Sequence, residues 1–142
     1  MKRTLTALVA ILLVFATVFS LASCNTVPKE GLWENATYRA DTTLGKGAKT
    51  FSLIVEAGEQ SVTFTVKTDE EMLDKALLGV ELIQGEDSRY GLTVITVNGI
   101  DAVWERDNAY WAIYIGEDYA PVGISSIEVE SGATYKLVWA QM

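Results

Sequence analysis

The chain contains no histidine and a single cysteine, Cys24. The absence of histidine excludes histidine-containing zinc sites and the imidazole-based acid–base chemistry of many enzymes. One cysteine cannot form a disulfide within the chain. An enzyme of this composition would depend on carboxylates, lysine, tyrosine or serine alone. We therefore expect a non-catalytic protein with no metal site and no cofactor.

Basic residues are also scarce, with 11 Lys and Arg against 19 Asp and Glu and a net charge of −8. Nucleic-acid-binding proteins need lysine and arginine to neutralise phosphates. A peripheral electrostatic attachment to anionic lipid needs them as well. The charge balance therefore argues against a nucleic-acid partner and against membrane attachment by charge.

The N-terminal segment has the pattern of a secretory signal peptide. Met1-Lys2-Arg3 is cationic, and residues 5–22 are free of charge. A membrane helix needs about 17–25 apolar residues, so length alone leaves a transmembrane anchor open as the alternative. The stretch ends in Leu21-Ala22-Ser23-Cys24, which resembles the lipobox of bacterial lipoproteins at all four positions. That resemblance implies cleavage after residue 23 and a diacylglyceryl group, with palmitate-type chains, on Cys24.

The resulting domain organisation has three parts. Residues 1–23 are the expected signal peptide, residues 24–35 the lipidated N-terminus with a polar tether, and residues 36–142 one domain. Multiple acyl chains hold a protein firmly, at about 0.8 kcal/mol per buried methylene. We therefore expect the domain at the extracytoplasmic face of the cell membrane. Trp33 is unusual in a tether and is a candidate for packing back on the domain.

Strand and turn patterns recur between residues 36 and 142. Residues 61–67 alternate between apolar and polar side chains, as in a half-buried strand, and Asn98-Gly99 is typical of a tight hairpin turn. Residues 109–115 form the strongest predicted strand. Residues 125–129 are also predicted as a strand, and residues 85–88 as a loop.

One helix is predicted, from Thr68 to about Leu78. Thr68-Asp69-Glu70-Glu71 matches a capping box, and Gly79 is expected to end the helix in a left-handed conformation. The apolar stripe that should face the sheet contains Met72, Leu73, Ala76, Leu77 and Val80. The element order predicts an α+β protein, with a β-grasp-like mixed sheet packed on one main helix.

An ordered series of segments resembles the transcobalamin-like C-terminal domain, which also occurs in lipoproteins of Gram-positive bacteria. The segments are Ala40 to Gly47, Lys67-Thr68-Asp69, Tyr90-Gly91-Leu92, Val97 to Ile100, Tyr110-Trp111-Ala112, Ile115-Gly116-Glu117, Gly123, and Gly132 to Tyr135. The resemblance covers about residues 36–142 and implies a β-grasp fold. In cobalamin carriers this domain closes over a ligand that a separate helical domain mainly holds. The expected partner is therefore a cobalamin-like small molecule, or a transporter or helical partner protein that supplies the other half.

Aromatic residues on and beside the strand at 109–115 are the predicted ligand-binding residues. Strand alternation places Tyr110 and Trp111 on opposite faces, and the Trp111 face is expected to be core. Trp104, Tyr110, Tyr114 and Tyr119 remain as an exposed aromatic patch, since Tyr and Trp offer large rigid surfaces with a polar group. The alternative is ordinary packing of the second face.

These features favour a surface module that captures cobalamin or another nutrient for a transporter. The alternative function is an adhesive or structural domain that contacts cell-wall polymer or host glycan.

Overall fold

The computed structural model describes residues 29–142, and the expected signal peptide and Cys24 lie outside this range. Alternating apolar residues build the central strands: Phe51, Leu53 and Val55 are at most 1% exposed, whereas their neighbours are half-buried. Such alternation buries one face of a sheet and leaves the other in contact with solvent. The same alternation holds at residues 61–67, where Val62, Phe64 and Val66 are at most 4% exposed, so the predicted half-buried strand is confirmed.

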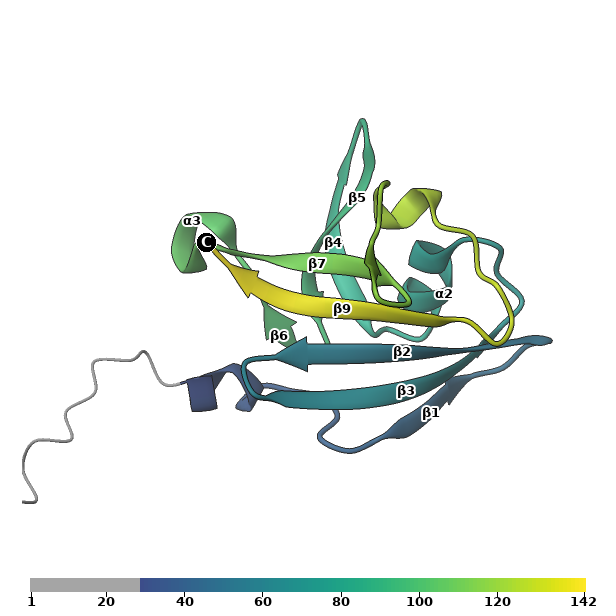
Figure 1. The fold of residues 1–142 in the computed structure, drawn as a ribbon, viewed down its shortest axis with the longest axis horizontal. Coiled ribbons are helices and arrows are strands. Elements are labelled where there is room, and N and C mark those ends of the chain that lie inside the picture. The colour runs from purple at the N-terminus through teal and green to yellow at the C-terminus, as the bar shows by residue number, and fades with distance from the viewer. Residues whose placement is uncertain (1–28) are drawn as a thin grey trace, which may run out of the picture.

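Six strands form a mixed sheet in the order β1-β3-β2-β9-β7-β8 (Figure 1). β1 runs parallel to β3 and β2 runs parallel to β9, whereas the other neighbours are antiparallel. The bounds are β1 (Thr42–Gly45), β2 (Lys49–Ala57), β3 (Gln60–Thr68), β7 (Ala109–Ile115), β8 (Asp118–Tyr119) and β9 (Thr134–Gln141).

A second, three-stranded sheet was not part of the sequence prediction. It contains β4 (Ile83–Ser88), β5 (Gly91–Val97) and β6 (Ile100–Asp101). Residues 85–88, expected to be a loop, pair with β5 instead, and the β4–β5 hairpin projects from the body of the domain (Figure 1). The segment is polar and exposed on both sides, so it lacks the alternation that marks a strand in sequence.

The Asn98-Gly99 turn is confirmed as the β5–β6 hairpin, with φ values of 52° and 79°. The Asn98 side chain is buried and both donates to and accepts from the backbone of Tyr38. A Cβ on Gly99 would lie 2.3 Å from the Asn35 carbonyl oxygen. The turn therefore anchors the segment that leads into β1.

Four short helices complete the described part of the chain: η2 (Lys29–Trp33), α2 (Leu73–Gly79), α3 (Trp104–Asp107) and η3 (Ile124–Ser126). The fold is thus mostly β, with mixed sheets and few helices. Trp33 is 4% exposed, and its indole N–H donates to the Ala57 carbonyl oxygen at 2.8 Å. Packing against the sheet therefore starts before residue 36.

The predicted helix exists, but it starts five residues later than expected. Thr68 still belongs to β3, and its hydroxyl accepts from the Glu70 amide rather than from Glu71. The Leu73 amide donates to the Ile127 carbonyl oxygen, and the Val129 amide donates to the carbonyl oxygen of Glu71. This pairing between distant segments holds residues 71–73 in an extended path, so the capping box does not form.

The end of α2 and the segment at 125–129 also differ from the sequence prediction. The left-handed residue after the helix is Glu81, with φ of 56°, rather than Gly79. The predicted strand at 125–129 is instead η3 followed by a single bridge between Met72 and Glu128. Leu73, Ala76 and Leu77 are nevertheless buried in the core, as the helical stripe predicts.

Candidate functional site

The four predicted ligand-binding residues all reach the surface, but they do not form one patch. Tyr110 is 36% exposed and Tyr119 is 60% exposed, while Tyr114 is half-buried. Tyr114 and Tyr119 pack edge to face, with ring centroids 5.5 Å apart, because β7 pairs with β8 at these positions. Trp104 is 49% exposed and is the first residue of α3. This helix comes just before Ala109, at the end of β7 that is farther from β8.

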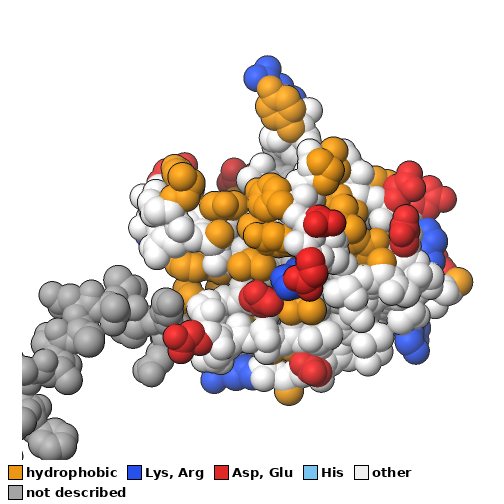
Figure 2. All heavy atoms as spheres, viewed as in Figure 1, with side chains coloured by type: hydrophobic (Ala, Val, Ile, Leu, Met, Phe, Trp, Pro, Cys, Tyr) orange, Lys and Arg blue, Asp and Glu red, His pale blue; other side chains and the backbone are white. Residues whose placement is uncertain are grey.

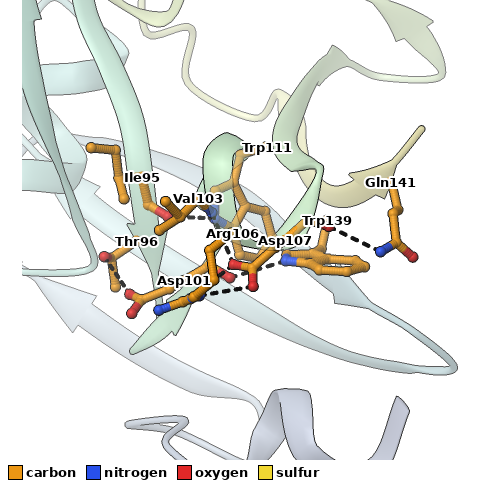
Figure 3. Close-up of polar contacts among 9 residues, drawn as sticks. All are labelled: Ile95, Thr96, Asp101, Val103, Arg106, Asp107, Trp111, Trp139 and Gln141. Carbon is orange, nitrogen blue, oxygen red and sulfur yellow. Dashed lines mark hydrogen bonds and ion pairs between the residues drawn. The ribbon is translucent and has the colours of Figure 1, made fainter. Parts of the chain in front are cut away.

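Two tryptophan side chains, one on β7 and one on β9, connect the inner face of the six-stranded sheet to the second sheet (Figure 3). Trp111 is 5% exposed and donates its indole N–H to the Ile95 carbonyl oxygen at 3.1 Å. Trp139, directly opposite on β9, donates to the Asp101 carbonyl oxygen at 3.0 Å. Each ring buries apolar area while its polar group is satisfied. The expected burial of Trp111 is confirmed.

A hollow of about 270 Å³ lies on this same inner side of β7. Trp111 and Ile113 come from β7, and Tyr119 comes from β8. The remaining lining residues belong to the connection before η3: Ala120, Pro121, Val122 and Gly123. Figure 2 shows hydrophobic side chains gathered on the viewed face, below the projecting hairpin.

A buried polar contact holds the projecting hairpin against η3. The Leu92 amide donates to the Ser125 hydroxyl oxygen at 2.9 Å, and that hydroxyl donates to the Asp74 carboxylate at 2.7 Å. Asp74 is only 4% exposed, and its carboxylate also accepts a hydrogen bond from the Lys75 amide at 2.7 Å. Gly91 sits so close to Ser125 that a Cβ there would lie 2.8 Å from the serine side chain. The part of the hairpin next to its turn is therefore held by α2 and η3 together.

No charged side chain lines the hollow. Glu117 and Asp118 form the turn immediately before Tyr119. Lys136 lies 3.5 Å from Glu117 and 3.6 Å from Glu56, so this lysine is already paired with carboxylates. The lining itself is apolar and aromatic, which suits a ligand with rings or aliphatic groups.

The one resolved electrostatic perturbation lies away from the hollow, in α3. Asp107 accepts two hydrogen bonds from the Arg106 guanidinium, both at 2.8 Å, and one from the Val103 amide (Figure 3). The Arg106 hydrogen bond lowers the pKa of Asp107, and the same contact raises the pKa of Arg106. This pair closes a turn of helix and faces no apolar hollow, which indicates a structural role.

Residues 29–142 contain no cluster of three acidic or cysteine side chains arranged to hold a metal ion. Over the same range, no helix is long and apolar enough to cross a bilayer. The lining contributed by Pro121 and Val122 was missed by the sequence prediction. The only available signal was an apolar run, Tyr119-Ala120-Pro121-Val122, directly after an acidic turn. That apolar loop residues line a hollow can be recognised only when the strand packed beside the loop is known.

No protein-family model and no curated protein sequence matches the chain. Solved structures do match it. One is a protein from Ruminococcus gnavus described as a candidate metal-binding protein, with a TM-score of 0.63 and 23% identity, covering 67% of this chain and 99% of that one. Another is haptocorrin in complex with Cbi, with a TM-score of 0.53 and 18% identity.

The haptocorrin match covers 66% of this chain but only 25% of haptocorrin. At these identities the two likenesses establish a shared fold. The predicted resemblance is thus supported in part, by a haptocorrin chain as a structural neighbour at low identity.

Proposed function

We propose that this protein is a non-catalytic binding module, held at the outer face of the cell membrane by lipid on Cys24, that captures a small molecule. One observation carries the binding role: the apolar hollow between β7 and the connection to η3, with Tyr119 on its rim. A concave apolar site with an aromatic lining is the usual form of a small-molecule site. Its floor is rigid because Trp111 is hydrogen-bonded to the second sheet.

The proposed ligand is cobalamin or another ring-bearing nutrient, delivered to a transporter or shared with a helical partner protein. Two observations support this choice. The hollow is lined by apolar and aromatic side chains, and the fold is shared with haptocorrin, whose structure contains Cbi. As part of the proposal, the mixed sheet with α2 is a β-grasp-like arrangement. A hollow of about 270 Å³ is small for a whole cofactor, which is why a partner forms part of the proposal.

A ligand screen tests the binding role. The chain from residue 25 onward is melted with corrinoids, other vitamins and soluble glycans. A ligand present at a hundred times its dissociation constant should stabilise the fold by about 2.7 kcal/mol. Stabilisation by glycans alone would favour the adhesive alternative, and no stabilisation by any of the three classes would contradict small-molecule capture.

Two matched variants then locate the site. Val122→Asp places a charge in the lining of the hollow, whereas Tyr110→Asp places a charge at an exposed position on the opposite face of β7. Binding through the hollow predicts that only Val122→Asp weakens affinity, by at least tenfold. A comparable loss in Tyr110→Asp would instead favour the wider aromatic patch of Trp104, Tyr110, Tyr114 and Tyr119.

The anchor is tested separately by metabolic labelling with a palmitate analogue. The wild-type chain should incorporate the label, and Cys24→Ala should not, because the thiol is the proposed attachment point. Ser23→Gly, which retains the cysteine, is a suitable control because it keeps a small residue at the cleavage position. Continued labelling of Cys24→Ala would contradict the anchor.

A further inference from the structure

Three features meet at one end of the domain: η2, α3 and the C-terminus (Figure 1). The Met142 amide donates to the Asn108 carbonyl oxygen at 3.1 Å, which places the last residue against α3. A polar hollow of about 350 Å³ is lined by residues of η2, of the β5–β6 turn and of α3, including Gly31, Gly99 and Arg106. The first described helix and α3 therefore lie next to each other.

The length of chain before η2 limits how far this end can be from a lipid on Cys24. Lys29 begins η2 and follows Cys24 by five positions. A fully extended chain spans at most about 3.6 Å per residue, which gives a reach of about 18 Å. The eight residues of β9 alone span about 27 Å. The segment from Cys24 to Lys29 is thus shorter than the domain is long. The end of the domain that contains η2 is therefore the end nearest the lipid.

The four tryptophans differ in exposure and hydrogen bonding, and the exposed one lies at the end of the domain formed by η2, α3 and the C-terminus. Trp33, Trp111 and Trp139 each donate the indole N–H to a backbone carbonyl inside the domain. Trp104 is the exposed tryptophan of the four, at 49%, and it lies on α3. Exposed tryptophan is favoured at a membrane–water interface, where the ring meets acyl chains and the N–H meets headgroups.

The neighbouring side chains suit the same environment. Met142 is 80% exposed beside α3, and the Arg106 side chain is 61% exposed. Long arginine side chains place their aliphatic part along apolar surface and the charge among headgroups. Acidic residues such as Glu105 are also present on α3, so the contact depends on Trp104 rather than on attraction to anionic lipid.

We propose that the end of the domain formed by η2, α3 and the C-terminus rests on the bilayer, with Trp104 inserted at the interface. The proposal rests on the lipid anchor at Cys24 proposed above. It also orients the binding hollow. β7 runs from α3 towards β8, so Tyr119 and Val122 lie at the end of the strand away from α3 and remain open to solvent. Trp104 is thereby a membrane-contact residue rather than a ligand-binding one.

The composition of the chain makes a direct test possible. Cys24 is the single cysteine, and lipidation consumes its thiol, so one introduced cysteine is a unique labelling site. Glu105→Cys places a fluorophore on α3, beside Trp104. Glu130→Cys is the matched control, since it replaces an exposed glutamate in the connection that precedes β9, at the opposite end of that strand.

The lipidated full chain is reconstituted into phosphatidylcholine vesicles that contain a quencher-labelled lipid. The expected result is at least threefold stronger quenching at position 105 than at position 130. Equal quenching, or stronger quenching at 130, would overturn the orientation. Flotation of the same samples separates the two proposals: a chain that does not float with vesicles contradicts the anchor, and the inference falls with it. A chain that floats but shows equal quenching contradicts the orientation alone.

The role of Trp104 is tested in the Glu105→Cys background. Trp104→Ala should reduce quenching at position 105 by at least half, whereas Tyr119→Ala, which removes another exposed aromatic ring, should leave it unchanged. Circular dichroism of each variant checks that the fold is retained. Unchanged quenching in folded Trp104→Ala would overturn insertion of this side chain.

Discussion

The two faces of β7 carry similar residues in different surroundings. On the inner face, Trp111 is 5% exposed and hydrogen-bonded to the second sheet. On the outer face, Tyr110 is 36% exposed. Adjacent aromatic residues in one strand therefore have separate roles. The difference indicates that stability depends more on Trp111 than on Tyr110.

The largest expected effect comes from Trp111→Ala. The change empties a buried ring site and removes one of the two hydrogen bonds that the Ile95 carbonyl oxygen accepts, the other coming from the Ala102 amide. Loss of a buried large aromatic costs about 3–5 kcal/mol, and chemical denaturation measures it. A loss below about 1 kcal/mol would show that the inner face is not the packed face.

The next largest effect is expected at Leu77→Ala, in the helix on the inner side. Leu77 is fully buried, and emptying such a leucine site costs about 2–5 kcal/mol. Leu78→Ala is the matched control, because its half-buried side chain lies next to Leu77 in the same helix. Equal losses in both variants would contradict the assignment of the buried helical stripe.

A smaller loss is expected from Ser125→Ala. It removes the hydroxyl that donates to Asp74 and accepts from the Leu92 amide. An unsatisfied buried group costs about 1–3 kcal/mol. Amide exchange at Leu92 should also accelerate, since the hairpin loses its contact with η3. Ser126→Ala changes an exposed neighbour and should have little effect; unchanged exchange at Leu92 in Ser125→Ala would contradict the role of this contact.

Tyr110→Ala should change the free energy of unfolding by less than about 1 kcal/mol, because the ring is partly in solvent already. The same denaturation series measures it beside Trp111→Ala. Similar losses in the two variants would show that the outer face of β7 is also core, and the contrast between the faces would disappear.

The smallest effect concerns Asp107 and pH. Because the Arg106 hydrogen bond lowers the pKa of Asp107 in the fold, this contact stabilises α3 fully above the ordinary aspartate pKa. The contribution is lost as pH falls through the lowered value. NMR titration of the Asp107 carboxyl should give a midpoint below that of an unperturbed aspartate, and Arg106→Gln should raise that midpoint. An ordinary midpoint in the wild type would contradict the pair.

Local pattern in the sequence determined much of this protein. Alternation set the buried faces of the strands and put Trp111 inside and Tyr110 outside, because side chains alternate regardless of what packs on them. Asn98-Gly99 determined a hairpin turn, since few residues accept positive φ at both central positions. The apolar stripe in α2 also identified the buried helix face, and the N-terminal pattern predicts a lipid anchor at Cys24.

Only the tertiary structure decided where these elements meet. The capping box at Thr68 looked complete in sequence, yet pairing of residues 71–73 with 127–129 moved the start of the helix to Leu73. β4 is a strand because its backbone pairs with β5. Its sequence does not alternate between apolar and polar residues, so this pairing could not be predicted from it. Tyr119 and Trp111 line one hollow, and Trp104 lies at the other end of β7, because strand pairing and loop packing join residues far apart in the chain. Contacts of this kind depend on which distant segments bury their surfaces against each other, and a local stretch of sequence does not contain that information.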